Sequence, residues 1–183
     1  PLILGVMGIV LLAGTLNLGT IVENQSGGFL NWYAFQQPLA LIIFFIAGVA
    51  ETNRAPFNLV EAESEIIGFH TEYSGFRFLI FFIAEFATAG IFSLIASVLF
   101  LGGWGVPFSW FGWDNVDSVD NWMNVGGPLI MFTKMLVLTF LIMWIRFSYP
   151  RFREDQLQRF AWKVLIPVAL VNIMITAILK VAF

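Results

Sequence analysis

Long uninterrupted apolar runs constrain this chain more than any other feature of its sequence. A helix needs about 20 apolar residues to cross a hydrocarbon core about 30 Å thick, and a backbone in lipid must satisfy its own hydrogen bonds. The runs also lack the strict apolar–polar alternation that is typical of outer-membrane barrels. Five segments qualify, with approximate bounds of 1–18, 33–50, 76–102, 129–147 and 161–177. We therefore predict an all-α fold: a polytopic transmembrane helix bundle in which residues 1–183 form a single integral membrane domain.

Composition supports a lipid environment and excludes several kinds of chemistry. The chain is 59% hydrophobic and 11% charged, whereas a soluble domain is about 45–50% apolar and about 25% charged. It has no cysteine, so it cannot by itself hold a disulfide, a thiolate zinc site or an iron–sulfur cluster. His70 is the only histidine, and it forms no recognisable metal motif. We predict no metal site and no catalytic residue in this chain.

The first residues indicate that the sequence is part of a longer protein. Pro1 opens an apolar run with neither an initiator Met nor the basic start of a signal peptide. We therefore read Pro1 as an internal position.

The distribution of basic residues predicts the orientation of the bundle. The segments around Glu23 and from 103 to 125 contain no Lys or Arg, whereas the loops 51–75 and 148–160 and their edges are basic. By the positive-inside rule, loops 51–75 and 148–160 face the cytoplasm or matrix. We predict a bacterial plasma membrane location, with an organellar inner membrane as the alternative. Aromatic residues near the predicted membrane edges, such as Trp32, are expected to act as interfacial anchors.

The second basic loop predicts a contact with either lipid or a protein partner. Anionic lipid headgroups attract such a cluster, and so does a soluble subunit that offers carboxylates for charge-assisted bonds. Nucleic acid is not expected, because the cluster is short and no soluble fold presents it. The candidate docking residues are Arg146, Arg151, Arg153 and Asp155.

The first inner loop is rich in carboxylates. Pro56 disfavours helix at the residue before it, so the second span should end there, and a short amphipathic helix is plausible from about 59 to 69. Glu61 and Glu65 are four residues apart and would share a face of that helix, whereas Glu63 would point elsewhere. His70 could carry a proton or donate a hydrogen bond, although a structural role is the more common one.

Glu85 and Lys134 fall well inside predicted spans. An ion at bilayer depth costs about 2.5–3.5 kcal/mol on insertion scales, so Glu85 and Lys134 should each face a cavity or a partner. Neighbouring carboxylates in a low dielectric cannot all stay ionised, and a chain of them can accept and pass protons. An ion pair between Glu85 and Lys134 that only assembles helices is the competing interpretation.

Several long motifs resemble one known family. The run AETNRAPFNLVEAESE, followed by HTEYSG and FFIAEFA, resembles the H subunit of proton-pumping NADH:quinone oxidoreductase, respiratory complex I. The similarity extends to IVENQ, LGGW and WIRFSYPRFREDQLQRFAWKVLIP. It covers essentially the whole chain and corresponds to the C-terminal half or more of the family.

The resemblance implies a membrane subunit that helps form the quinone chamber and starts an acidic path toward proton translocation. Quinone would be the substrate, while FMN and iron–sulfur clusters would belong to partner subunits. Peripheral iron–sulfur and quinone-site subunits and neighbouring membrane subunits would be the partners. Glu85 and Lys134 would match the proton relay. The implied chamber residues are Glu51, Arg54, Glu61, Glu63, Glu65 and Glu72.

The sequence departs from the family pattern in the same loop. The family usually has Asp where this chain has Asn58, and Pro where it has Val60. The stretch from Glu65 to Gly68 is also one residue shorter, which on a helix is about 100° of rotation. Two other functions stay open at this point: a proton or cation transporter whose path uses Glu85 and Lys134, and a membrane anchor of a related hydrogenase or dehydrogenase.

Overall fold

The computed structural model describes residues 1–26, 29–52, 54, 56–57, 74–105, 119–150 and 152–182. All regular structure in these ranges is helical, which confirms the predicted all-α class. The helices are α1 (Leu2–Ala13), α2 (Leu18–Asn24), α3 (Tyr33–Gln36), α4 (Pro38–Glu51), α6 (Phe76–Phe100), α7 (Val119–Ser148), α8 (Glu154–Phe160) and α9 (Ile166–Ala182). A short 3-10 turn, η1 (Phe29–Asn31), precedes α3, and a π-helical turn, η3 (Ala161–Leu165), joins α8 to α9.

Three stretches of the described chain are long and apolar enough to cross a membrane: Phe76–Phe100, Gly126–Ser148 and Asp155–Ala182. The last of these begins earlier than the predicted span 161–177, because α8 continues through η3 into α9. Most of the predicted loop 148–160 is therefore helical. Its residues Glu154–Phe160 are mainly good helix formers, which carry the helix into the polar interface.

The first two predicted spans are interrupted. Between α1 and α2 the chain bends by 62°, and Gly14 ends α1 in the left-handed conformation with a φ of 72°. Pro38 starts α4 and disfavours helix at Gln37, whose φ of −135° separates α3 from α4. By length and composition, the described residues hold three possible spans, or four if α1 and α2 count as one, and α4 is a shorter apolar helix of 14 residues.

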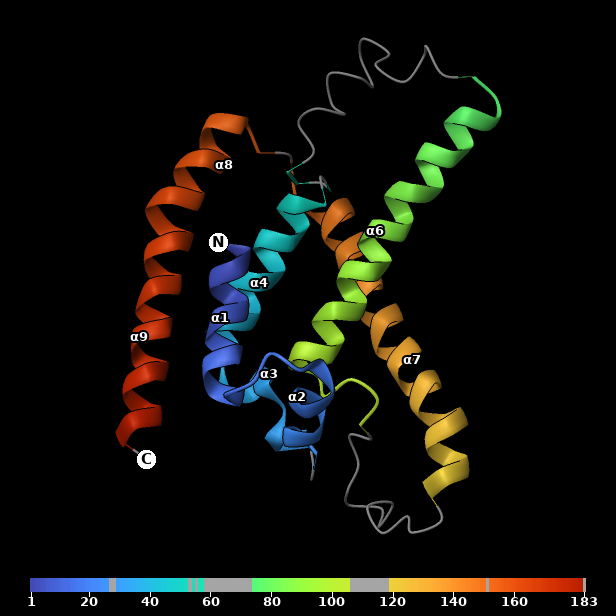
Figure 1. Ribbon diagram of the computed structural model, residues 1–183. Coiled ribbons are helices and arrows are strands. Elements are labelled where there is room, and N and C mark those ends of the chain that lie inside the picture. The colour runs from blue at the N-terminus through green and yellow to red at the C-terminus, as the bar shows by residue number, and fades with distance from the viewer. Residues whose placement is uncertain are drawn as a thin grey trace.

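The helices pack through small residues and aromatic rings. Figure 1 shows α4 between α1 and α6, with α9 beside α1 and α7 crossing α6. A Cβ atom on Gly48 of α4 would lie 1.8 Å from the ring of Phe92, so only glycine permits this approach of α4 to α6. Phe44 stacks on Phe92 with ring centroids 5.1 Å apart. The buried core continues through Phe100 and Ile142.

The first half of α6 projects beyond the end of α4 (Figure 1). Every residue from 76 to 84 is exposed, and most of them are large and apolar. Only from Ala89 onward does α6 become part of the buried core. The 25 residues of α6 make a helix about 37 Å long.

Candidate functional site

Arg54 is the most deeply buried charged residue in the described part of the chain. It follows the end of α4 and is 1% exposed. Its backbone N–H donates to the carbonyl of Val49 at 3.2 Å, and its own carbonyl accepts from the N–H of Phe57 at 2.9 Å. These bonds hold the chain close to the helix end, so the guanidinium group turns inward. Such a charge must have an ionic or polar partner to offset its desolvation.

Glu85 supplies that partner from α6. Its Oε1 lies 3.4 Å from Nη1 of Arg54, and the guanidinium carbon sits 4.3 Å from the ring centroid of Phe86. Glu85 is the tenth residue of α6, about 14 Å along the axis from its first residue. Because the start of α6 projects beyond α4, Glu85 is nevertheless level with the end of α4. Its side chain is 30% exposed, so one edge of the carboxylate can reach further groups.

A row of aromatic rings on α6 leads to this ion pair. Phe78 and Phe82 have centroids 6.2 Å apart, and Phe82 and Phe86 have centroids 4.7 Å apart. The spacing of four residues places all three on one side of the helix. The row therefore runs along the projecting half of α6 and ends at Arg54.

Most of the predicted chamber acids lie outside the residues that the structure describes. Glu51 is the last residue of α4 and is exposed. The loop predictions for the amphipathic helix and for positions 58 and 60 fall in the range 58–73, which lies outside the described residues. The same range contains the chamber candidates Glu61, Glu63, Glu65 and Glu72, together with His70.

Lys134 lies at the other end of the bundle and is not paired with Glu85. Its Nζ donates to three backbone carbonyls that follow α6, those of Leu101 at 2.7 Å, Gly103 at 2.9 Å and Gly105 at 2.7 Å. Leu101 is sixteen residues beyond Glu85 on the same helix, about 24 Å along its axis. The competing interpretation of a Glu85–Lys134 pair is therefore wrong. The ring of Trp32 lies 4.5 Å from Nζ.

Trp32 differs from the interfacial anchor expected from its position. It is 7% exposed and packs against Gly102, where an added Cβ would lie 2.8 Å from Nε1 of the indole. The ring thus covers Lys134 rather than facing lipid. Hydropathy alone does not distinguish a tryptophan at the lipid boundary from one that closes a buried polar group.

Gln25 bonds to the same end of α6 as Lys134, and it was not predicted to be a site residue. Its Oε1 accepts from the backbone N–H of Gly102 at 3.0 Å and from that of Tyr33 at 3.3 Å. Its Nε2 donates to the carbonyls of Val98 and Leu99 at 3.3 and 3.2 Å. The signal was present in the sequence, because Gln25 ends the IVENQ motif and Gly102 belongs to LGGW. The two family motifs are in contact.

The predicted docking residues lie around the junction of α7 and α8. Arg146 is in the last turn of α7. Arg153 precedes α8 and pairs with Asp155 at 3.2 Å, with both side chains about two-thirds exposed or more. Arg151 is outside the described residues. Within the described ranges, no three His, Asp or Glu side chains gather as a metal site would require.

Comparison with known proteins identifies the family. A family model described as NADH dehydrogenase matches residues 1–177. The H subunit of NADH-quinone oxidoreductase from Geobacillus thermodenitrificans is 45% identical over 184 residues, an alignment that covers 100% of this chain and 51% of the relative. The H subunit of the same enzyme from Bacillus thuringiensis is 47% identical over 185 residues with the same coverage. The chain thus spans about half the length of the curated relatives it matches. With nearly its whole length matched, the chain belongs to the NADH dehydrogenase family.

Proposed function

We propose that this chain is part of the membrane subunit of an NADH:quinone oxidoreductase. In this role it helps form the quinone-binding chamber and couples quinone reduction to proton translocation through a chain of carboxylates. The relatives at 45–47% identity are named as the H subunit of this enzyme. The chamber residues in this proposal are Glu51, Arg54, Glu61, Glu63, Glu65 and Glu72.

The contact between Arg54 and Glu85 is the observation that carries the proposal. It joins the start of the acidic loop to the membrane helix α6 across 3.4 Å. Reduction of a quinone to a quinol takes up two electrons and two protons, so groups around the chamber lose protons and the local charge changes. In a low dielectric such a change acts strongly on a charge a few ångströms away.

The covalent order of the chain supports the same path. Residues 58–73, which contain four of the proposed chamber acids, connect Phe57 to the segment that enters α6. A charge change along this loop therefore reaches α6 both through the backbone and through Arg54. Glu85, which is partly exposed, would then take a proton from the loop or give one to a neighbouring membrane subunit.

The redox chemistry belongs to partner subunits in this proposal. FMN and iron–sulfur clusters would deliver electrons, since the chain has no cysteine to hold a cluster. Arg146, Arg151, Arg153 and Asp155 would dock a peripheral subunit on the cytoplasmic side of a bacterial plasma membrane. Lys134 keeps the relay role only through the family resemblance, because its own contacts are with backbone carbonyls.

Replacing Glu85 in the intact complex tests the coupling role. Glu85→Gln keeps the shape of the side chain but removes its charge and its proton, so protons pumped per NADH oxidised should fall several-fold in proteoliposomes. The amount of assembled complex should stay unchanged. Glu23→Gln is the matched control, because Glu23 is an exposed acid at the opposite end of the bundle. A normal pumping ratio in Glu85→Gln would remove Glu85 from the relay.

Replacing Arg54 tests the chamber role separately. Arg54→Ala should slow NADH:quinone reduction while leaving electron transfer from NADH to an artificial acceptor intact, because that acceptor takes electrons in the partner subunits. Glu85→Gln/Arg54→Ala removes both charges and separates the loss of a quinone contact from the cost of leaving Glu85 unpaired. A chain that purifies without any redox subunit would instead be an independent transporter.

A further inference from the structure

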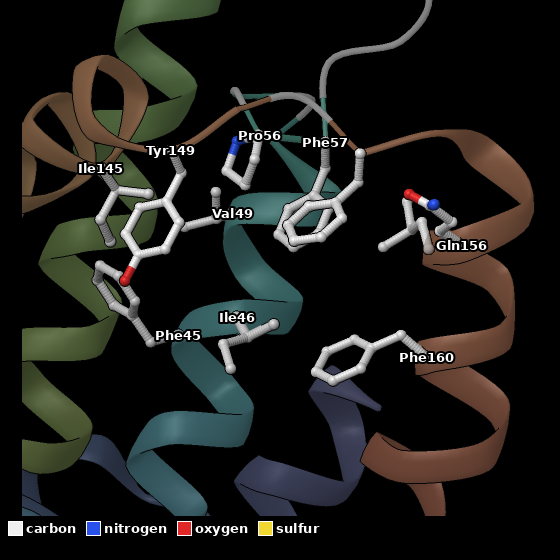
Figure 2. Close-up of a pocket in the computed structure, with 11 residues that line it drawn as sticks. Phe45, Ile46, Val49, Pro56, Phe57, Ile145, Tyr149, Gln156 and Phe160 are labelled. Carbon is white, nitrogen blue, oxygen red and sulfur yellow. The ribbon is translucent and has the colours of Figure 1, made fainter.

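An apolar pocket lies beside the basic junction of α7 and α8. It has a volume of about 530 Å³ and is lined by α4, the end of α7, α8 and the segments between them. Figure 2 shows Ile46 of α4 and Phe160 of α8 turned toward the same space, with Tyr149 on the opposite side. No lining residue comes from α6.

Specific contacts close one end of this pocket. The rings of Phe57 and Phe152 stack with centroids 5.7 Å apart, and the N–H of Phe152 donates to the carbonyl of Pro56 at 2.9 Å. These contacts tie the segment after α4 to the segment before α8. The space below them is lined by α4, α7 and α8.

The lining selects an apolar chain. Apart from the hydroxyl of Tyr149 and the amide of Gln156, the side chains that line the pocket are hydrocarbon. The Oε1 of Gln156 already accepts from the backbone N–H of Arg153 at 3.4 Å. The volume falls within the range of about 300–1,000 Å³ that is usual for small-molecule sites. An occupant must therefore offer a flexible hydrocarbon segment and few polar groups.

The charge beside the pocket selects an anionic headgroup. The segment 146–163 has five basic and two acidic residues, in a chain whose net charge is −3. Arg159 lies between the lining residues Gln156 and Phe160 in the sequence, and Lys163 follows Phe160 by three residues, in the π-helical turn η3. Arg159 and Lys163 are both exposed. Long basic side chains lie along apolar surface while their charged ends reach polar headgroups.

We propose that this pocket binds one acyl chain of an anionic phospholipid from the inner leaflet, with its phosphate held by Arg159 and Lys163. The proposal rests on the placement of the basic loops on the inner side. A bound lipid would join α8 to α4 at the end of the bundle where the helices α8 and α7 meet. The pocket has no lining residue on α6, whereas its lining residues Val49 and Phe57 are hydrogen-bonded to the backbone of Arg54.

Photoreactive lipids in the intact complex test the proposal. The complex is reconstituted in nanodiscs of phosphatidylcholine that carry a trace of phosphatidylglycerol with a diazirine in one acyl chain, or the same diazirine lipid with a choline headgroup. Labelled peptides from 45–57 and 145–160 should favour phosphatidylglycerol by about tenfold or more, since each basic residue near an anionic lipid contributes about fivefold. This preference should disappear in Arg159→Gln/Lys163→Gln. Arg77→Gln, a basic exposed residue of α6 away from the pocket, should leave it unchanged.

A second variant tests the pocket itself. Leu157→Trp fills the space from α8 and should abolish labelling of both segments while the outer lipid-facing surfaces are labelled as before. If this variant does not assemble, Arg159→Gln/Lys163→Gln still decides the question, because both side chains are exposed.

Three results would overturn the proposal. Equal labelling by both headgroups would mean that the pocket takes any bulk lipid. Displacement of the label by a short-chain quinone, without headgroup preference, would assign the pocket to a quinone tail. Absence of label in the assembled complex would mean that a partner subunit fills the space. None of these results depends on proton pumping, so they test the lipid proposal independently of the proposed function.

Discussion

The side chains of Lys134 and Lys180 each donate hydrogen bonds to carbonyls at the end of a neighbouring helix. Lys134 of α7 donates to the carbonyls after α6, and Lys180 of α9 donates to the carbonyls of Leu11 and Leu12 at 2.6 and 3.3 Å, at the end of α1. The last carbonyls of a helix lack intrahelical donors and carry partial negative charge. A lysine from a neighbouring helix satisfies them where water is scarce. This explains why two basic residues occur toward the end of the bundle whose loops contain none.

The buried lysine should therefore matter for stability. Lys134→Met leaves three carbonyls without their donor, of which that of Gly103 is buried, and a buried acceptor without a partner costs about 1–3 kcal/mol. We expect a marked loss of assembled complex and a lower thermal midpoint, with partial recovery in Lys134→Arg. Lys180→Met is the matched control and should cost less, because Lys180 is exposed and donates to two carbonyls instead of three. A Lys134→Met complex of normal stability that no longer pumps protons would instead assign Lys134 to the relay.

The pairing of Arg54 with Glu85 depends on the relative heights of α4 and α6, which cannot be seen in a sequence. The pattern placed Glu85 well inside a span and Arg54 in a loop, at different expected depths. Because α6 begins beyond the end of α4, the two residues meet. Residue type predicted that Glu85 needs a partner, whereas the relative height of two helices decides which partner it finds.

At the scale of the helices, the end of α6 is shaped by two glycines and by the groups that close around them. Gly102 has a φ of 67°, and the N–H of Gly103 donates to the carbonyl of Ser97 at 3.0 Å. The turn brings Gly102 against Trp32 and Gln25. The helix end, Gln25 and Lys134 thus form one polar cluster.

Substitution of Gly102 should lower the stability of the protein by more than backbone strain alone would. A left-handed conformation costs a non-glycine residue about 1–2 kcal/mol, and the Cβ of Gly102→Ala would also lie 2.8 Å from the buried indole of Trp32. Gly14→Ala is the control, because Gly14 has a φ of 72° and its Cβ would approach only the flexible end of Lys180. Unfolding midpoints of the purified subunit should fall further for Gly102→Ala. Equal losses would show that Trp32 yields without cost.

Helix type could be predicted from the sequence more completely than helix continuity. Apolar run length identified α6 and the membrane part of α7 closely, because twenty or so apolar residues leave few alternatives. The breaks at Gly14 and Gln37 depend on single backbone angles, which hydropathy does not report. The helix α8 consists mainly of polar residues, so a prediction from hydropathy assigns it to a loop. For the candidate site, the motifs likewise identified residues but not their contacts. The contact of Gln25 with Gly102, for example, joins residues that are 77 positions apart.

At the scale of the whole molecule, the two ends of the bundle differ in character. One end has the Arg54–Glu85 pair, the basic junction of α7 and α8 and the apolar pocket beside that junction. The other end has the helix caps made by Lys134 and Lys180 and the side-chain bonds of Gln25. Figure 1 shows α8 at one end and α2 and α3 at the other. This polarity suits a protein that receives a soluble partner on one side only.

The absence of cysteine makes the orientation directly measurable. A thiol introduced at Gln158, which is exposed on α8, should react with a membrane-impermeant maleimide in inside-out vesicles and resist it in intact cells. A thiol at Ser26, which is exposed just after α2, should show the opposite pattern. Both positions are exposed and polar, so each serves as the control for the other, and disruption of the membrane should make both reactive. The reverse pattern would place the basic loops outside, where a cytoplasmic redox partner could not dock on Arg146 and Arg153. Labelling of both thiols from the same side would mean that the chain crosses the membrane an even number of times between α2 and α8.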